Sequence, residues 1–176
     1  EAAENYLYSI EDTLRSVKEL FNNSPQLITA IKKTIEENAD LERQVSDFVR
    51  QKVGEIKAKL LEKRTEVNGV RLFLIQRNVP AEVVKDIAFQ IAGELHEPFV
   101  FLAACAEDGK ASLTLMLSKD LVDGRGWNAS QLIRSASKHI QGGGGGQPHF
   151  ATAGGKNPDG LNAAVEELLV ALNLKA

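Results

Sequence analysis

The most informative stretch of this 176-residue sequence is Gly142–Lys156, which reads GGGGGQPHFATAGGK. Five consecutive glycines are unusual inside a folded domain, because ordering each glycine backbone costs extra conformational entropy. The run is short, and predicted helices stand on both sides of the stretch. We therefore interpret it as a glycine-rich loop within a domain rather than a flexible linker. Such a loop can direct several main-chain N–H groups toward one anion.

Around this loop the sequence predicts a small α/β unit. The turn Asp108-Gly109 joins two apolar runs and is typical of a β-hairpin. Asn128, followed by Gln131, is typical of a helix N-terminus with a capping box. The predicted elements are strands over Val70–Gln76, Phe99–Ala106 and Ala111–Ser118, and helices over Pro80–Leu95, Asn128–Gln141 and Asp159–Leu172. At least three strands and three helices indicate one compact layered unit.

The first 66 residues are predicted to be helical, with one break at residues 22–25. Ser24 suits the N-cap of the second helix, and Pro25 suits its first position. Apolar spacing in that helix is heptad-like as far as Phe48 and then slips to a stripe beginning at Val49. A single helix cannot bury such a stripe alone. We therefore expect the first helix to fold back as a hairpin, or a second copy of the chain to pack there as a homodimer.

These patterns predict an α+β fold, with a small sheet flanked by helices after a long helical, coiled-coil-like arm. We expect an arm over residues 1–66 and a globular unit over 67–176. The first residue is Glu1 rather than methionine, so we expect a piece of a longer protein. No apolar run approaches the roughly 20 residues that span a bilayer, so no membrane association is expected. The single cysteine, Cys105, excludes an internal disulfide and a cysteine-based zinc site, and it suits a reducing cytoplasm.

Charge is distributed unevenly along the chain, although the net charge is only −3. The window 124–158 contains four basic residues and no acidic one, and the window 41–77 contains nine basic and five acidic residues. A locally basic surface can hold phosphates on a protein that is acidic overall. The sequence thus permits nucleic-acid binding at two places.

The sequence does not match the known motifs for nucleotide binding or catalysis. Gly155-Lys156 is followed by Asn157, so the phosphate-binding loop pattern is incomplete. Gly124–Ala129 fits a loose dinucleotide pattern, but no acidic residue follows within the expected distance. The three histidines have no ligand spacing, and no serine has an evident base. We expect no catalytic residue, no bound metal and no cofactor in this chain.

Four features of the sequence occur together: Val67–Val70 opening a strand, the hairpin ending in Ser118-Lys119-Asp120, the helix through Ile133 and the stretch Gly142–Gly155. In this combination the sequence resembles the C-terminal domain of bacterial alanyl-tRNA synthetases. The resemblance implies a DHH-associated fold after a helical spacer. It further implies a parent ligase that uses ATP, magnesium and zinc at sites outside this chain. The implied partners are tRNA for alanine, contacted at its elbow so that aminoacylation and editing share it, and a second subunit.

The residues expected to contact RNA lie in or beside the acid-free window. They are Arg125, Arg134, Lys138, Gly142, Gly143, Gly144, Gly145, Gly146, Gln147, His149 and Lys156. Arg134 and Lys138 would share one helix face at i,i+4. Trp127 and Phe150 can stack on a base or pack in the core, and both readings stay open. In the arm, seven basic residues can add phosphate contacts or form an ordinary solvated face. They are Arg43, Arg50, Lys52, Lys57, Lys59, Lys63 and Arg64.

Two other functions remain alternatives to an RNA-binding module. One is the substrate-binding domain of a DHH-type phosphoesterase, although the DHH motif is absent and Gln147-Pro148 precede His149. The other is a structural dimerisation arm with incidental affinity for nucleic acid. A preference for folded tRNA over a duplex of equal length at equal salt would separate the first reading from the last.

Overall fold

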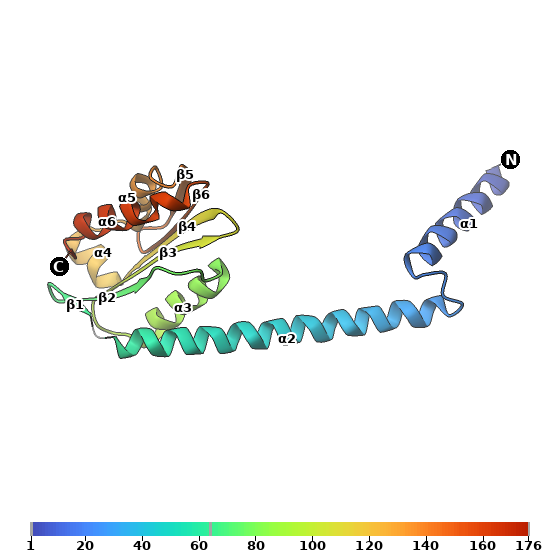
Figure 1. The fold of residues 1–176 in the computed structure, drawn as a ribbon, viewed down its shortest axis with the longest axis horizontal. Coiled ribbons are helices and arrows are strands. Elements are labelled where there is room, and N and C mark those ends of the chain that lie inside the picture. Colours follow the sequence, from blue (N-terminus) through green and yellow to red (C-terminus); the bar gives the residue numbers. More distant parts are fainter. Residues whose placement is uncertain (1, 64, 176) are drawn as a thin grey trace. The chain divides into compact units, whose positions relative to one another are not determined.

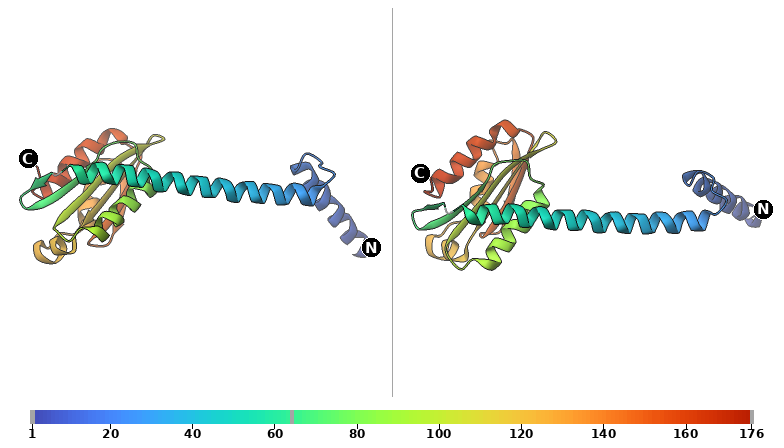
Figure 2. Two further views of the ribbon diagram at one scale, coloured as in Figure 1. Left: turned by 90° about the horizontal axis from the view of Figure 1, so that it is seen from below. Right: turned by 60° about the horizontal axis from the view of Figure 1, so that its bottom comes forward.

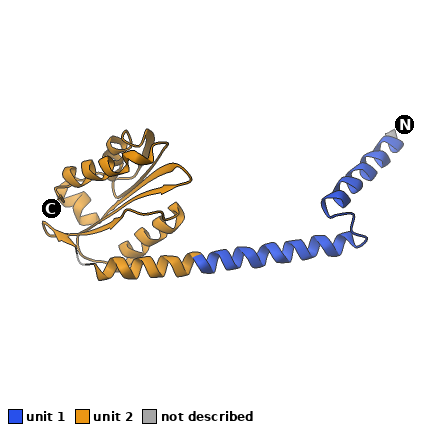
Figure 3. Cartoon of the chain, in the orientation of Figure 1, with its two compact units in different colours: residues 1–48 blue, residues 49–176 orange. Residues whose placement is uncertain are grey.

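The structure is a computed structural model that describes residues 2–63 and 65–175, so Arg64 lies outside the described residues. The chain divides into two compact units, residues 1–48 and residues 49–176, coloured separately in Figure 3. The expected boundary between residues 66 and 67 falls after the end of helix α2 (Leu27–Glu62), whereas the compact units divide within it.

The first unit contains helix α1 (Ala2–Leu20), a short turn and the first part of α2. At the turn, the Gln26 N–H donates to Ser24 Oγ at 3.3 Å, but α2 begins at Leu27, two residues after Pro25, the predicted first position of the helix. The expected fold-back packing is not formed, because Tyr6, Ile10 and Leu14 of the apolar stripe are exposed. On α2, Leu41 and Val45 are also exposed. The first unit therefore carries apolar side chains that its own helices do not cover.

The second unit is built on a six-stranded mixed sheet (Figure 1). Its strands are β1 (Glu66–Val67), β2 (Val70–Ile75), β3 (Phe99–Glu107), β4 (Lys110–Leu117), β5 (Gly142–Gly146) and β6 (Phe150–Gly155). The strand order is β1-β2-β3-β4-β6-β5. Only β2 and β3 are parallel; the other neighbours are antiparallel. The sheet therefore ends in β5, the glycine segment, at one edge.

Helices cover both faces of this sheet (Figures 1 and 2). On one face, Val53 and Leu60 of α2 join α3 (Ala81–Glu94) over side chains such as Phe73 and Phe101. On the other face, α4 (Lys119–Arg125), α5 (Ala129–Ala136) and α6 (Leu161–Ala171) enclose a second core. The short 3₁₀ turn η1 (Pro158–Gly160) leads into α6. The predicted α+β class is confirmed.

The slip in the apolar repeat of α2 coincides with a change of packing partner. Before the slip, Leu41 and Val45 are exposed. After it, Val53 and Leu60 are buried against the sheet, and Val49 and Ile56 are partly buried there. The second stripe is therefore the face by which α2 joins the globular core, rather than a continuation of a coiled-coil seam.

Two local predictions are wrong. Gly142–Gly146 is an edge strand rather than a loop, since it pairs residue by residue with β6. The helix predicted over Asn128–Gln141 ends at Ala136, and turns follow it. Helix α4, which holds Arg125 at its end, was not predicted, because its seven residues are too few to show an apolar period.

Candidate nucleic-acid interface

The glycine strand is one arm of a tight hairpin. The Gln147 N–H donates to the Phe150 carbonyl at 2.8 Å, and the Phe150 N–H donates back at 3.2 Å. This mutual pair sets the alternation of the antiparallel ladder. Counting back from Gln147, the main-chain groups of Gly145 and Gly143 face β6 as hydrogen-bonded positions. The N–H and C=O of Gly144, which lies between them, point away from β6. The main-chain groups of Gly144 are therefore directed to the open edge of the sheet, where glycine adds no side chain of its own.

The glycines of this hairpin fall into two groups by the space around them. A β-carbon on Gly142, Gly144 or Gly146 would stand between 2.0 and 2.5 Å from the backbone of β6. These three glycines are required by the fold, because such contacts force the strands apart. A β-carbon on Gly143 or on Gly154 would meet nothing within 4 Å. The fold itself therefore does not explain why these two positions are glycine.

Helix α5 places a cation against the same strand. The Asn128 side chain accepts from the Gln131 N–H at 3.2 Å and caps the helix, as predicted. One turn along, the Arg134 guanidinium lies against Gly145: a β-carbon there would be 3.6 Å from its Nε and Nη2. The structure thus brings Arg134 and the glycine strand together.

Lys138 lies in a different setting from the one predicted. Because α5 ends at Ala136, Lys138 is in the following turn rather than one helical turn from Arg134. Glu167 of α6 accepts from Ser135 Oγ at 2.5 Å and lies 2.6 Å from His139 Nε2. The hydrogen bond from Ser135, then that from His139, and the Lys138 charge lower the pKa of Glu167. The acid-free segment thus receives a carboxylate from a distant element.

The remaining predicted residues of the hairpin lie at its two ends. Lys156 and Gly142 line a cavity of about 600 Å³ that also includes Gly154. His149 lies at the opposite end and lines a cavity of about 620 Å³ between α3 and α4. Gln147 is exposed in the turn beside it. These residues form a band along the hairpin rather than one converging cluster.

Arg125 is apart from this band. Its guanidinium donates to the Asn68 carbonyl at 3.1 Å, in the turn before β2, and lies 5.0 Å from the centre of the Trp127 ring. Trp127 is partly buried against the core, and Phe150 packs on Phe89 with ring centres 5.0 Å apart. Both aromatic side chains therefore have packing partners within the protein.

Comparisons with known proteins identify the globular unit. Residues 66–173 match the DHHA1 domain family. The chain belongs to this family. Its DHHA1 domain and arm are 56% identical, over 173 residues, to an alanine–tRNA ligase of Porphyromonas gingivalis. That alignment covers 98% of this chain and 20% of the relative, so the chain spans about a fifth of the length of the curated relatives it matches.

Solved structures agree with this assignment of the DHHA1 domain. The C-Ala domain of Aquifex aeolicus alanyl-tRNA synthetase superposes with a TM-score of 0.52 at 27% identity, covering 64% of this chain and 99% of that one. RecJ of Thermus thermophilus in complex with Mg²⁺ shares the fold, with a TM-score of 0.52 at 15% identity, over 76% of this chain and 19% of RecJ. The predicted resemblance to the C-terminal region of alanine–tRNA ligase is confirmed.

Within residues 2–63 and 65–175, no group of three or more His, Cys, Asp or Glu side chains could hold a metal ion. In the same ranges, none of the helices is both long and apolar enough to cross a membrane. Cys105 is buried, and burial raises the pKa of its thiol.

Proposed function

We propose that this chain is a non-catalytic, tRNA-binding module of alanine–tRNA ligase, with the exposed edge of β5 and helix α5 as its RNA-binding surface. The observation that carries the proposal is the presence of glycine at positions 143 and 154, where the protein itself leaves room for a side chain. An RNA backbone can approach a strand closely only where no side chain projects. Arg134 stands beside that strand and supplies a positive charge for a phosphate.

Folded RNA is recognised through shape, phosphates and 2′-hydroxyls, and main-chain donors suit all of these. We place the tRNA elbow on this surface, as the family resemblance implies, so that one tRNA can reach the aminoacylation and editing sites of the whole enzyme in turn. ATP, magnesium and zinc would act at those other sites. The cytoplasm, where tRNA is charged, is the compartment that this role requires.

Dimerisation through the first unit is the second part of the proposal. Leu41 and Val45 lie four residues apart on α2, a spacing within the heptad pattern, and they are 58% and 62% exposed. An apolar stripe of this kind is typical of a helix that packs on a partner helix. A second copy of the chain would supply the same stripe and close the contact symmetrically.

The experiment that tests RNA binding measures the affinity of the 176-residue chain for a folded tRNA transcript for alanine. An RNA duplex of equal length at equal salt is the control for charge alone. Preference for the tRNA supports the proposal. Equal affinity for the two RNAs, or no affinity for either, would instead favour a structural arm whose role lies in assembly.

A further inference from the structure

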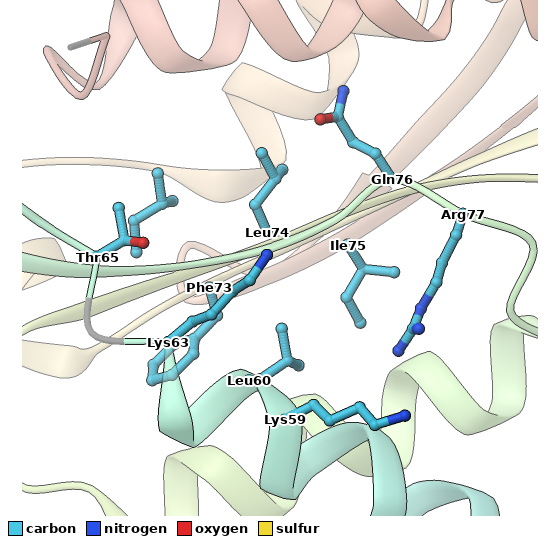
Figure 4. A pocket seen from close by; sticks show the side chains of 10 residues that line it. Lys59, Leu60, Lys63, Thr65, Phe73, Leu74, Ile75, Gln76 and Arg77 are labelled. Carbon is cyan, nitrogen blue, oxygen red and sulfur yellow. The ribbon is translucent and has the colours of Figure 1, made fainter.

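A cavity of about 490 Å³ lies in the second unit, at the other edge of the sheet from the glycine strand. It is lined by the end of α2, the residues after it and the exposed side of β2, as the close view in Figure 4 shows. The cavity is lined by three cations: Lys59 of α2, Lys63 just after α2 and Arg77 just after β2. None of its ten lining residues is acidic.

Among the described residues, the three cations around this cavity differ from neighbouring cations in forming no ion pair with a carboxylate, although the pKa of Glu55 is lowered first by its Gln51 hydrogen bond and last by the charge of Lys59. Lys57 lies 2.7 Å from Glu94, and Arg71 lies 2.7 Å from Glu97. Within the part of the chain that the structure describes, no such ion pair forms at Lys59, Lys63 or Arg77. Glu55, one turn before Lys59, bonds Gln51 and Lys52 instead. Three like charges around one hollow repel one another, and a bound anion removes that repulsion.

Main-chain groups add to this surface, because β1 covers only the start of β2. The paired positions of β1 and β2 end at Arg71, and the Leu72 N–H then donates to the Thr65 carbonyl at 2.8 Å. Peptide groups alternate in direction along a strand. The N–H and C=O of Leu74 and the N–H of Gln76 therefore point to the same open side as the Leu72 N–H. Both residues line the cavity.

We propose that this cavity, defined by Lys59, Lys63 and Arg77, binds phosphate groups of an RNA backbone at a second site, remote from the glycine strand. The proposal deepens the proposed tRNA-binding function and rests on it. An acidic peptide added as a strand to β2 is the competing occupant. The open stretch of β2 offers such a peptide only the main-chain groups of Leu74 and Gln76. The three cations therefore contribute more to affinity than the strand edge does, which favours RNA phosphates.

The position of the cavity explains how two sites could serve one ligand. Four strand spacings separate β2 from β5 in the sheet order, or roughly 19 Å at about 4.8 Å each. A mononucleotide cannot reach across that distance. A large folded RNA that touches both edges would gain from two linked contacts, each of which is weak alone.

The first test uses the 176-residue chain labelled with ¹⁵N, with a single-stranded uridine 10-mer, inorganic phosphate and a glutamate 10-mer as separate probes. We expect the amide signals of Leu74 and Gln76 to shift with the uridine 10-mer. Lys59→Gln/Lys63→Gln/Arg77→Gln should abolish that shift. The control Lys18→Gln/Lys32→Gln/Lys85→Gln removes three exposed charges elsewhere and should keep it. A response to the glutamate 10-mer alone, to inorganic phosphate alone, or to none of the three overturns the proposal.

The second test measures affinity for the folded tRNA transcript as salt is raised. Losing three phosphate contacts should reduce the slope of log affinity against log salt by about 2, and weaken binding at low salt by roughly tenfold. The control variant should leave the slope unchanged, and an unchanged slope in the cavity variant contradicts the proposal. The failures of the two proposals can be distinguished. If substitution of Gly143 leaves tRNA affinity unchanged while the cavity variant has a reduced salt slope, only the glycine-strand site is contradicted.

Discussion

The guanidinium of Arg134 lies against Gly145, with its Nε and Nη2 atoms 3.6 Å from where a β-carbon would stand. This relationship joins a charge on α5 to a bare strand at the sheet edge. Arg134→Gln should therefore weaken tRNA binding and lower the salt slope by about 0.7 to 0.9, the value of one phosphate contact. Lys85→Gln, an exposed charge on α3, is the matched control, and a salt titration of both variants gives the answer.

Neighbouring glycines of β5 should respond oppositely to the same substitution. Gly143→Ala adds a methyl group where nothing lies within 4 Å, so we expect no loss of stability or a gain of up to about 1 kcal/mol. Gly144→Ala places its methyl group 2.5 Å from the Thr152 carbonyl, and it should lose about 1 to 3 kcal/mol. Urea unfolding of both variants measures the difference. Equal losses would show that the strand is not spaced as described.

Glu167→Gln should lower stability and strengthen RNA binding at the same time. The carboxylate is bonded to Ser135 and His139 but its side chain is 35% exposed, so we expect a loss under about 1 kcal/mol at neutral pH. Removal of a negative charge beside Lys138 and His139 should raise affinity for the tRNA transcript.

The stability effect of Glu167→Gln should depend on pH with a definite sign. The folded-state pKa of Glu167 is lowered, first by the Ser135 hydrogen bond, so the folded protein binds this proton less readily than the unfolded chain does. Its contribution is then full above the ordinary carboxyl pKa of about 4.3 and is lost as pH falls below that value. Unfolding at pH 7 and near pH 3 tests this. A difference between wild type and variant that is as large near pH 3 as at pH 7 would contradict it.

The two parts of α2 should differ in their contribution to stability. Leu60 is buried against the sheet, and Leu60→Ala should cost about 2 to 5 kcal/mol. Leu41→Ala removes the same atoms from an exposed position and should leave the unfolding of the globular unit unchanged. If the proposed dimer forms, Leu41→Ala should instead weaken self-association, which sedimentation at several concentrations measures. A large effect of Leu41→Ala on globular stability would argue against the described division.

The fold class could be predicted from the sequence because several of its signals are local. The Asp108-Gly109 turn lies between β3 and β4, and Pro80 stands at the start of α3, as expected. The slip at Phe48–Val49 was also visible. The cause of the slip could not be predicted, because the spacing of apolar residues within one helix does not show which surface packs against each stripe.

The sequence indicated which residue types the candidate site would contain, but not how those residues would be arranged. The glycine run was interpreted as a loop because strand propensity disfavours glycine, and only its pairing with Ala151–Gly155 makes it a strand. Glu167 was missed since it comes from α6, outside the acid-free window. For Lys59 and Lys63 the sequence allows both phosphate contacts and a solvated helix face, because it does not show that Arg77 lines the same cavity.

The glycine strand as the RNA contact is the central claim, and Gly143→Val tests it most directly. A valine there has room within the protein and suits a strand, so the melting temperature should stay within a few degrees of wild type. Its side chain would project where we place the RNA backbone. We predict that affinity for the folded tRNA transcript falls by at least about tenfold, or 1.4 kcal/mol. Wild-type affinity in a folded Gly143→Val variant would contradict the account.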